Sequence, residues 1–156
     1  MRSHEVFQQM TPEEAAGLLE VLREESPAIA TVALGAAAAA FKLRRQFLMR
    51  QPRERQADWV RRALARPGNA AAAEEVLADF FLEHQKDLLL ELLDALGVEH
   101  EDGALAQTNP PSPTKRKLGA AVKKFRAGEE SSYRELLLRA FAAQSAIDWP
   151  DLEALL

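Results

Sequence analysis

Eight prolines divide this chain, and none of them lies inside a stretch of regularly spaced apolar residues. Proline inside a helix removes a backbone hydrogen bond and clashes with the preceding turn, whereas the first helical turn accepts it well. Thr11-Pro12 and Ser26-Pro27 therefore each predict a capped helix start, and Glu14, three residues after Thr11, strengthens the first of them. We expect the chain to fold as a series of separate helices.

Between these breaks, apolar residues recur every three or four positions, as they do on one face of a helix. Composition agrees, because alanine and leucine dominate the apolar residues and β-branched residues are few. No stretch of four or more residues alternates convincingly as a strand. We predict an all-α fold, a helical bundle of about six helices with a short C-terminal helical segment, the helices covering about 12–25, 27–50, 52–66, 70–96, 114–127 and 132–146.

Three further residues have a predicted structural role. Pro67-Gly68-Asn69 should end one helix, with Asn69 capping the next. Gly97 should end the longest helix in the left-handed conformation that glycine adopts without strain. Gln85 projects into the middle of that helix's apolar side, and we expect it to be a buried amide with hydrogen-bond partners.

The length of 156 residues suits one domain, and a chain of this size buries enough surface to need no disulfides. Asn-Pro-Pro-Ser-Pro at 109–113 cannot be helical and predicts a semi-rigid linker. The apolar stripe of the helix that follows must be covered by something. We therefore predict one α-helical domain over 1–156, made of a main body at 1–97, a linker at 98–113 and a helical hairpin at 114–156 that packs back on the body.

Charged residues are strongly segregated along the chain. Residues 42–66 hold nine basic and two acidic residues, 69–103 hold one basic and ten acidic, and 115–126 hold six basic and none acidic. The whole chain nevertheless has a formal net charge of only −4. Segregated charge either neutralises itself within the fold or faces a charged partner. The simpler expectation is that the two basic helices partly neutralise the acidic one.

Four acidic residues recur every four positions in the predicted acidic helix: Asp79, Glu83, Asp87 and Glu91, with His84 at the edge of their face. They form either a solvated face, partly neutralised by the basic helices, or a docking surface for a basic partner. A metal site is disfavoured, because ligands from one straight helix cannot surround an ion. The Glu-x-x-His pattern of di-metal bundles is also absent. We predict no metal site and no cofactor.

The basic blocks suggest a nucleic-acid partner, because phosphate binding needs lysine and arginine clustered on one surface. Two observations weigh against it. The chain is acidic overall, with an isoelectric point near 5.5. A helix-turn-helix reads DNA with its second helix. In the predicted helix pairs 52–66 with 70–96 and 114–127 with 132–146, the basic helix comes first. From the first block we select Arg44, Arg45, Arg55 and Arg62 as candidate partner-binding residues.

Enzyme chemistry finds no support in the sequence. There is no glycine-rich phosphate loop, no G-x-S-x-G and no H-E-x-x-H. The absence of cysteine excludes disulfides, thiolate metal sites and cysteine nucleophiles. The N-terminus has no apolar signal segment, and the longest apolar run, Ala28–Phe41, is shorter than the roughly 20 residues that a membrane span needs. We therefore expect a cytoplasmic protein that does not enter a membrane.

These features favour a non-enzymatic protein-interaction or scaffold module. Its partner is expected to be another protein, or a second copy bound through the small residues around Gly35 and Ala39. The alternative is a nucleic-acid-binding protein that uses the basic helices 42–66 and 115–126.

Overall fold

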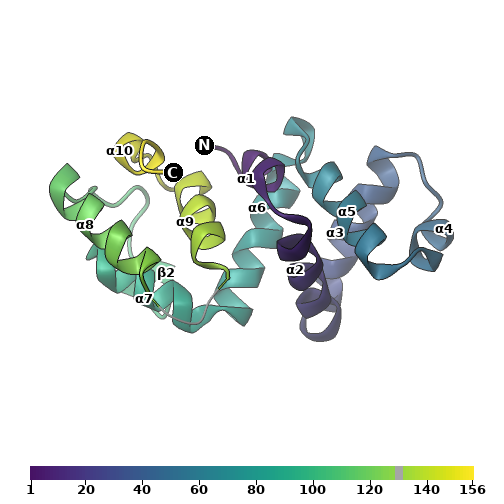
Figure 1. Ribbon diagram of the computed structural model, residues 1–156, viewed down its shortest axis with the longest axis horizontal. Helices are drawn as coiled ribbons and strands as arrows, with labels where there is room; N and C mark the ends of the chain where they lie inside the picture. The colour runs from purple at the N-terminus through teal and green to yellow at the C-terminus, as the bar shows by residue number, and fades with distance from the viewer. Residues whose placement is uncertain (129–131) are drawn as a thin grey trace. The chain divides into compact units, whose positions relative to one another are not determined.

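The computed structural model describes residues 1–128 and 132–156 (Figure 1). The predicted hairpin at 114–156 includes residues 129–131, which lie outside the described residues. The fold is all-α, as predicted, with ten α-helices and one two-stranded hairpin in the described part. The elements are α1 Ser3–Gln9, α2 Pro12–Glu25, α3 Pro27–Ala40, α4 Arg45–Arg50, α5 Arg53–Leu64, α6 Ala70–Asp79, α7 Lys86–Leu96, β1 His100–Glu101, β2 Ala104–Leu105, α8 Lys115–Arg126, α9 Arg134–Ala143 and α10 Pro150–Glu153.

The chain divides into two compact units. The N-terminal unit comprises residues 2–80, and the C-terminal unit comprises residues 81–156 together with Met1. The single-domain organisation over 1–156 stays a prediction.

Helix starts in the N-terminal unit lie where the prolines predicted them. α2 begins at Pro12, and the hydroxyl of Thr11 accepts a hydrogen bond from the backbone N–H of Glu14 at 3.1 Å. α3 begins at Pro27. The short helix α1 was not predicted, because its seven residues give too little periodicity to recognise.

Helix α5 packs against α2 and α3, while α6 packs against α1 and α3. The core of the unit is built from the apolar stripes of these helices. Its largest fully buried side chains are Phe7, Leu18, Leu19, Leu22, Leu48, Leu64 and Phe80.

The prediction of one continuous helix over 27–50 is wrong. α3 ends at Ala40, the chain turns through Lys42 at a φ of 52°, and α4 starts afresh at Arg45. A straight helix would have carried the last ten residues about 15 Å further along the α3 axis. The turn instead brings Leu48 into the core, where it is fully buried.

The prediction of one continuous helix over 70–96 is also wrong. α6 ends at Asp79, Phe80–His84 form a π-helical turn, and Gln85 is the N-cap of α7. The wider turn rotates the side chains that follow it relative to a regular helix. Gln85 is consequently only partly buried, so the expected buried amide is not found there.

Asn69 also departs from its predicted role. It is the N-cap residue of α6, but its side chain makes no capping bond there. Its amide instead donates to the carbonyl of Ala63 at 2.8 Å, which also accepts from the N–H of Arg66 at the end of α5.

In the C-terminal unit, α8 packs against α7 and α9, and α10 packs against α8 and α9. Gly97 ends α7 in the left-handed conformation, as predicted. The β1–β2 hairpin follows, with Asp102 and Gly103 both at positive φ in its two-residue turn. An Asp-Gly pair is a strong signal for this turn, and the sequence therefore contained a hairpin that was not predicted.

Hydrogen bonds join the proline-rich stretch at 109–113 to the segment 146–149. The N–H of Asn109 donates to the carbonyl of Ala146 at 2.8 Å, and its side-chain oxygen accepts from the N–H of Asp148 at 3.1 Å. The indole N–H of Trp149 donates to the carbonyl of Pro110 at 2.8 Å. These bonds hold 109–110 in one place within the C-terminal unit.

Arg134 joins three helices of the C-terminal unit. Its buried guanidinium donates to both carboxylate oxygens of Glu91 on α7, at 2.8 and 3.1 Å, and to the carbonyl of Phe125 on α8 at 3.0 Å. It also lies over the Phe125 ring, 4.7 Å from the centroid. A Cβ atom at Gly128 would come within 2.4 Å of the Arg134 Cζ, so a larger residue here would have to displace the guanidinium.

We expect Gly128→Ala to lower the free energy of unfolding by about 1–3 kcal/mol, because the added methyl displaces a guanidinium held by Glu91 and Phe125. Gly119→Ala is the matched control. It lies inside α8 with nothing within 4 Å of an added Cβ, so it should raise stability by about 0.5–1 kcal/mol. Urea unfolding of both variants measures the difference. Equal effects of the two substitutions would contradict this account of Gly128.

A fragment ending at residue 108 tests the predicted packing of the C-terminal helices on the rest of the chain. It lacks α8, against which α7 packs, and so exposes apolar side chains such as Leu92. We expect the fragment to unfold at a lower urea concentration than the intact chain. A fragment as stable as the intact protein would refute the single-domain prediction.

Candidate partner-binding surface

Helix α5 has two faces of opposite character. Arg55, Trp59, Arg62 and Arg66 follow one another at intervals of four, three and four residues, which places them along one side of the helix axis. Arg66 lies just beyond the helix end. The opposite side is buried in the N-terminal unit and consists of Gln56, Ala57, Val60, Ala63 and Leu64.

The outward side of α5 carries arginines stacked on aromatic rings. The guanidinium carbons of Arg62 and Arg66 lie 5.1 and 4.6 Å from the centroid of the Phe41 ring. Arg55 lies 5.9 Å from the Trp59 ring, which in turn contacts Phe47 of α4 at a centroid distance of 5.8 Å. Cation–π contacts of this kind hold long arginine side chains in defined positions.

Large apolar side chains are exposed beside these arginines. Phe47 and Met49 of α4 are 48% and 47% exposed, and Val32 of α3 is 36% exposed. Arg45 connects the two helices, because its guanidinium donates to the hydroxyl of Thr31 at 3.5 Å. We call the following set the basic–aromatic surface: Phe41, Arg44, Arg45, Phe47, Met49, Arg55, Trp59, Arg62 and Arg66.

The arginines of this surface keep their charge uncompensated by ion pairs. Among the described ion pairs of the N-terminal unit, Arg53 and Arg23 pair with Glu20, and Arg61 pairs with Asp58 at 2.7 Å. None joins an arginine of the basic–aromatic surface to an acidic side chain. The expected neutralisation of this basic block by acidic helix residues is therefore not found within the unit.

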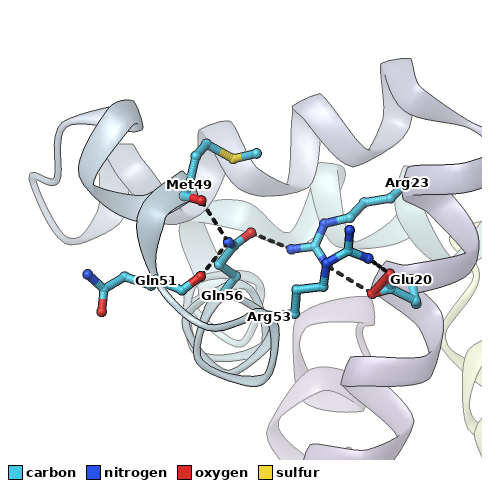
Figure 2. Close-up of polar contacts among 6 residues, drawn as sticks. All are labelled: Glu20, Arg23, Met49, Gln51, Arg53 and Gln56. Atoms are coloured by element: carbon cyan, nitrogen blue, oxygen red, sulfur yellow. Dashed lines mark hydrogen bonds and ion pairs between the residues drawn. The ribbon is translucent and has the colours of Figure 1, made fainter.

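A polar cluster centred on the buried side chain of Gln56 lies on the inward side of α5 (Figure 2). The side-chain amide of Gln56 donates to the carbonyls of Gln51 at 2.8 Å and Met49 at 3.3 Å, and its oxygen accepts from Arg23. Burial lowers the pKa of Arg23, because desolvation disfavours its charged form. Figure 2 shows the side chains of Met49 and Gln51 directed away from this cluster while their carbonyls face it.

Gln56 therefore fixes the end of α4 and the connection to α5. By holding the Met49 carbonyl, it sets the position from which the Met49 side chain projects outward. A buried glutamine with both its amide and its oxygen hydrogen-bonded stabilises one backbone arrangement, because any alternative leaves polar groups unpaired.

The structure places the predicted acidic residues in three different elements. Asp79 is the last residue of α6, Glu83 and His84 lie in the π-helical turn, and Asp87 and Glu91 belong to α7. The evenly spaced series that a straight helix would have presented does not exist. Glu83 and Asp87 are exposed, whereas Glu91 pairs with Arg134.

The predicted basic residues are better grouped. Arg55 and Arg62 share one side of α5, and Arg44 and Arg45 lie at the start of α4. The aromatic residues Phe41, Phe47 and Trp59 were not selected, because the sequence pattern places them on apolar helix faces that were expected to line the core. The alternation of arginine and aromatic residues at helical spacing could have identified this surface from the sequence.

Two features are absent from the residues that the structure describes. The described residues contain no group of three or more histidine, aspartate or glutamate side chains arranged to hold a metal ion. None of the described helices combines the length and the apolar character that crossing a membrane requires.

Comparison with protein-family models, curated proteins and solved structures finds no match to this chain.

We expect Gln56→Leu to lower the free energy of unfolding by about 1–3 kcal/mol, because it leaves the Met49 and Gln51 carbonyls without their donor. Arg53→Gln is the control within the same cluster. It removes only the exposed pair with Glu20 and should change stability by less than about 1 kcal/mol. Thermal and urea unfolding give both values. If Gln56→Leu were neutral, the cluster would not hold α4 in place.

Proposed function

We propose that this protein is a non-enzymatic interaction module that binds an acidic protein segment through its basic–aromatic surface. The observation that carries the proposal is the exposure of Phe47 and Met49, nearly half of each side chain, among arginines that have no acidic partner in the N-terminal unit. An acidic segment with apolar side chains complements both features at once.

The energetics of protein interfaces agree with this partner. Apolar surface removed from water contributes about 25 cal/mol per Å², so covering Phe47 and Met49 favours association. Arginine, tryptophan, phenylalanine and methionine are the residues enriched at the centres of protein interfaces. Stacking on Phe41 and Trp59 also reduces the entropy that Arg55, Arg62 and Arg66 lose when they bind a carboxylate.

A nucleic-acid partner is the second candidate for the same surface. The combination of arginines with aromatic rings favours it, because bases stack on aromatic side chains while cations bind phosphates. Two features favour protein instead. The exposed aliphatic side chains of Val32 and Met49 gain nothing from phosphates. The Phe41 ring is already in contact with two arginines, which leaves less of it for a base.

Selection from a displayed library of random 16-residue peptides tests the proposal. Peptides that bind the intact protein should be enriched in aspartate and glutamate and should also carry aromatic or aliphatic residues. We expect Phe47→Ala with Met49→Ala, or Arg62→Gln alone, to weaken the selected peptides about tenfold or more, as loss of an interface anchor does. Isothermal calorimetry measures each affinity.

Arg53→Gln is the matched control, because it removes the same charge from α5 outside the basic–aromatic surface. It should leave peptide affinity within about twofold, apart from a small effect on long-range attraction. Equal losses from Arg53→Gln and Arg62→Gln would mean that net charge alone attracts the peptides. A surface that selects no acidic peptide but binds a 20-nucleotide DNA strand would favour the second candidate.

Light scattering over a range of protein concentrations distinguishes self-association from binding of a peptide or of DNA. If a second copy covers the apolar side chains, the mass should rise with concentration in the intact protein and not in the Phe47→Ala, Met49→Ala variant. A constant monomer mass, together with peptide binding, would leave the acidic segment as the partner.

A further inference from the structure

A second charged surface lies on α8 in the C-terminal unit. The helix buries Leu118, Val122 and Phe125 and is therefore held firmly against its neighbours. Its other side is basic and exposed. The exposed residues are Lys115, Arg116, Lys117, Lys123, Lys124 and Arg126.

Five of these six cations have no acidic partner among the residues that the structure describes. Among the described ion pairs of the C-terminal unit, Arg126 joins Glu135, but none involves the lysines or Arg116 of α8. Lys124 borders an open cavity of about 540 Å³ together with Glu91 and Asp94. Both carboxylates already have other partners, since Glu91 binds Arg134 and Asp94 binds His100 at 2.9 Å.

The helix dipole does not stabilise the cations at the start of α8, whereas it favours Lys123, Lys124 and Arg126 in the last turn. Lys115, Arg116 and Lys117 occupy the first turn of α8, at the positive end of the helix dipole. Like charges are thus concentrated at a site that a folded chain alone does not favour. A polyanion lying along the helix would relieve this repulsion.

The shape of the face suits a charged backbone that approaches closely. Gly119 and Ala120 lie between the two groups of cations, and nothing is within 4 Å of a Cβ placed on Gly119. Ala120 is exposed. At 1.5 Å of rise per residue, the centres of the two groups are about 11 Å apart along α8.

The described residues of the C-terminal unit expose no large hydrophobic side chain. This excludes the apolar face with which an amphipathic helix enters a membrane, since that face of α8 is buried. It also excludes the aromatic platforms on which single-stranded bases stack and the apolar anchors of protein interfaces. A regular double helix needs neither, because its phosphates supply the attraction by themselves.

We infer that the exposed basic face of α8 binds the phosphate backbone of double-stranded nucleic acid without reading its sequence. The inference is independent of the basic–aromatic surface, which belongs to the N-terminal unit. Four or five cations predict contact with about as many phosphates.

Fluorescence anisotropy of the full chain with a labelled 20-base-pair DNA duplex, from 25 to 200 mM salt, tests the inference. Each phosphate contact contributes about −0.9 to the slope of log affinity against log salt, so four or five contacts in the intact protein should give a slope of about −3.6 to −4.5. Lys123→Gln with Lys124→Gln should reduce the slope by about 2 and weaken binding about tenfold or more at low salt.

Arg53→Gln is the control, because it removes a cation from the other unit, outside the basic–aromatic surface, and should leave duplex affinity within about twofold. The substitutions on α8 should leave the affinity for the selected acidic peptides unchanged, so the two ideas fail separately. Circular dichroism confirms that the variants are folded.

Three results would overturn the inference. The first is no binding of the duplex at 25 mM salt. The second is binding that the substitutions on α8 leave unchanged. The third is equal or tighter binding to vesicles containing phosphatidylserine, with the same dependence on Lys123 and Lys124.

Discussion

The N-terminal unit depends on α5 having one buried side and one exposed, basic side. Its buried side packs against α2 and α3, and that side includes one polar residue, Gln56. Because this amide is removed from water, it must be hydrogen-bonded, and it finds its partners in Arg23 and in the carbonyls of Met49 and Gln51. The same bonds that satisfy Gln56 hold α4 beside α5. The packing of one helix thereby determines where the exposed side chains of the next one project.

Arg134 has the corresponding role in the C-terminal unit. It is a buried cation, and its position is possible because Glu91 neutralises it, the Phe125 carbonyl accepts from it and Gly128 leaves room for it. Burying a charge requires such partners, because an unpaired charge in the interior is very unfavourable. No described ion pair involves the lysines of α8, which lie at the surface. Among the described residues, the unit therefore buries a cation that has partners and exposes cations that have no ion pair.

Much of the fold could be predicted from local chemistry. Thr11-Pro12 and Gly97 were assigned correctly, because capping and left-handed backbone depend on a few adjacent residues. Ser26-Pro27 gave the correct helix start, but the side chain of Ser26 makes no capping bond there. The breaks at Lys42 and at Phe80–His84 were not predicted, because neither contains a proline or a glycine. The break at Lys42 lies where a straight helix would carry apolar side chains such as Leu48 away from the core. The candidate surface was predicted in part: Arg44, Arg45, Arg55 and Arg62 were selected. Arg66 was not, and Phe47 and Trp59 were assigned to the core.

The sequence by itself determined the helical class, most helix starts and the segregation of charge. These properties depend on residue type and spacing along the chain. Only the tertiary structure decided which apolar residues are buried, because exposure depends on what packs opposite each side chain. Leu48 and Phe47 are neighbours of similar hydrophobicity, yet one is fully buried and the other nearly half exposed. The turn at Lys42 makes that difference, and it places an aromatic ring among arginines at the surface.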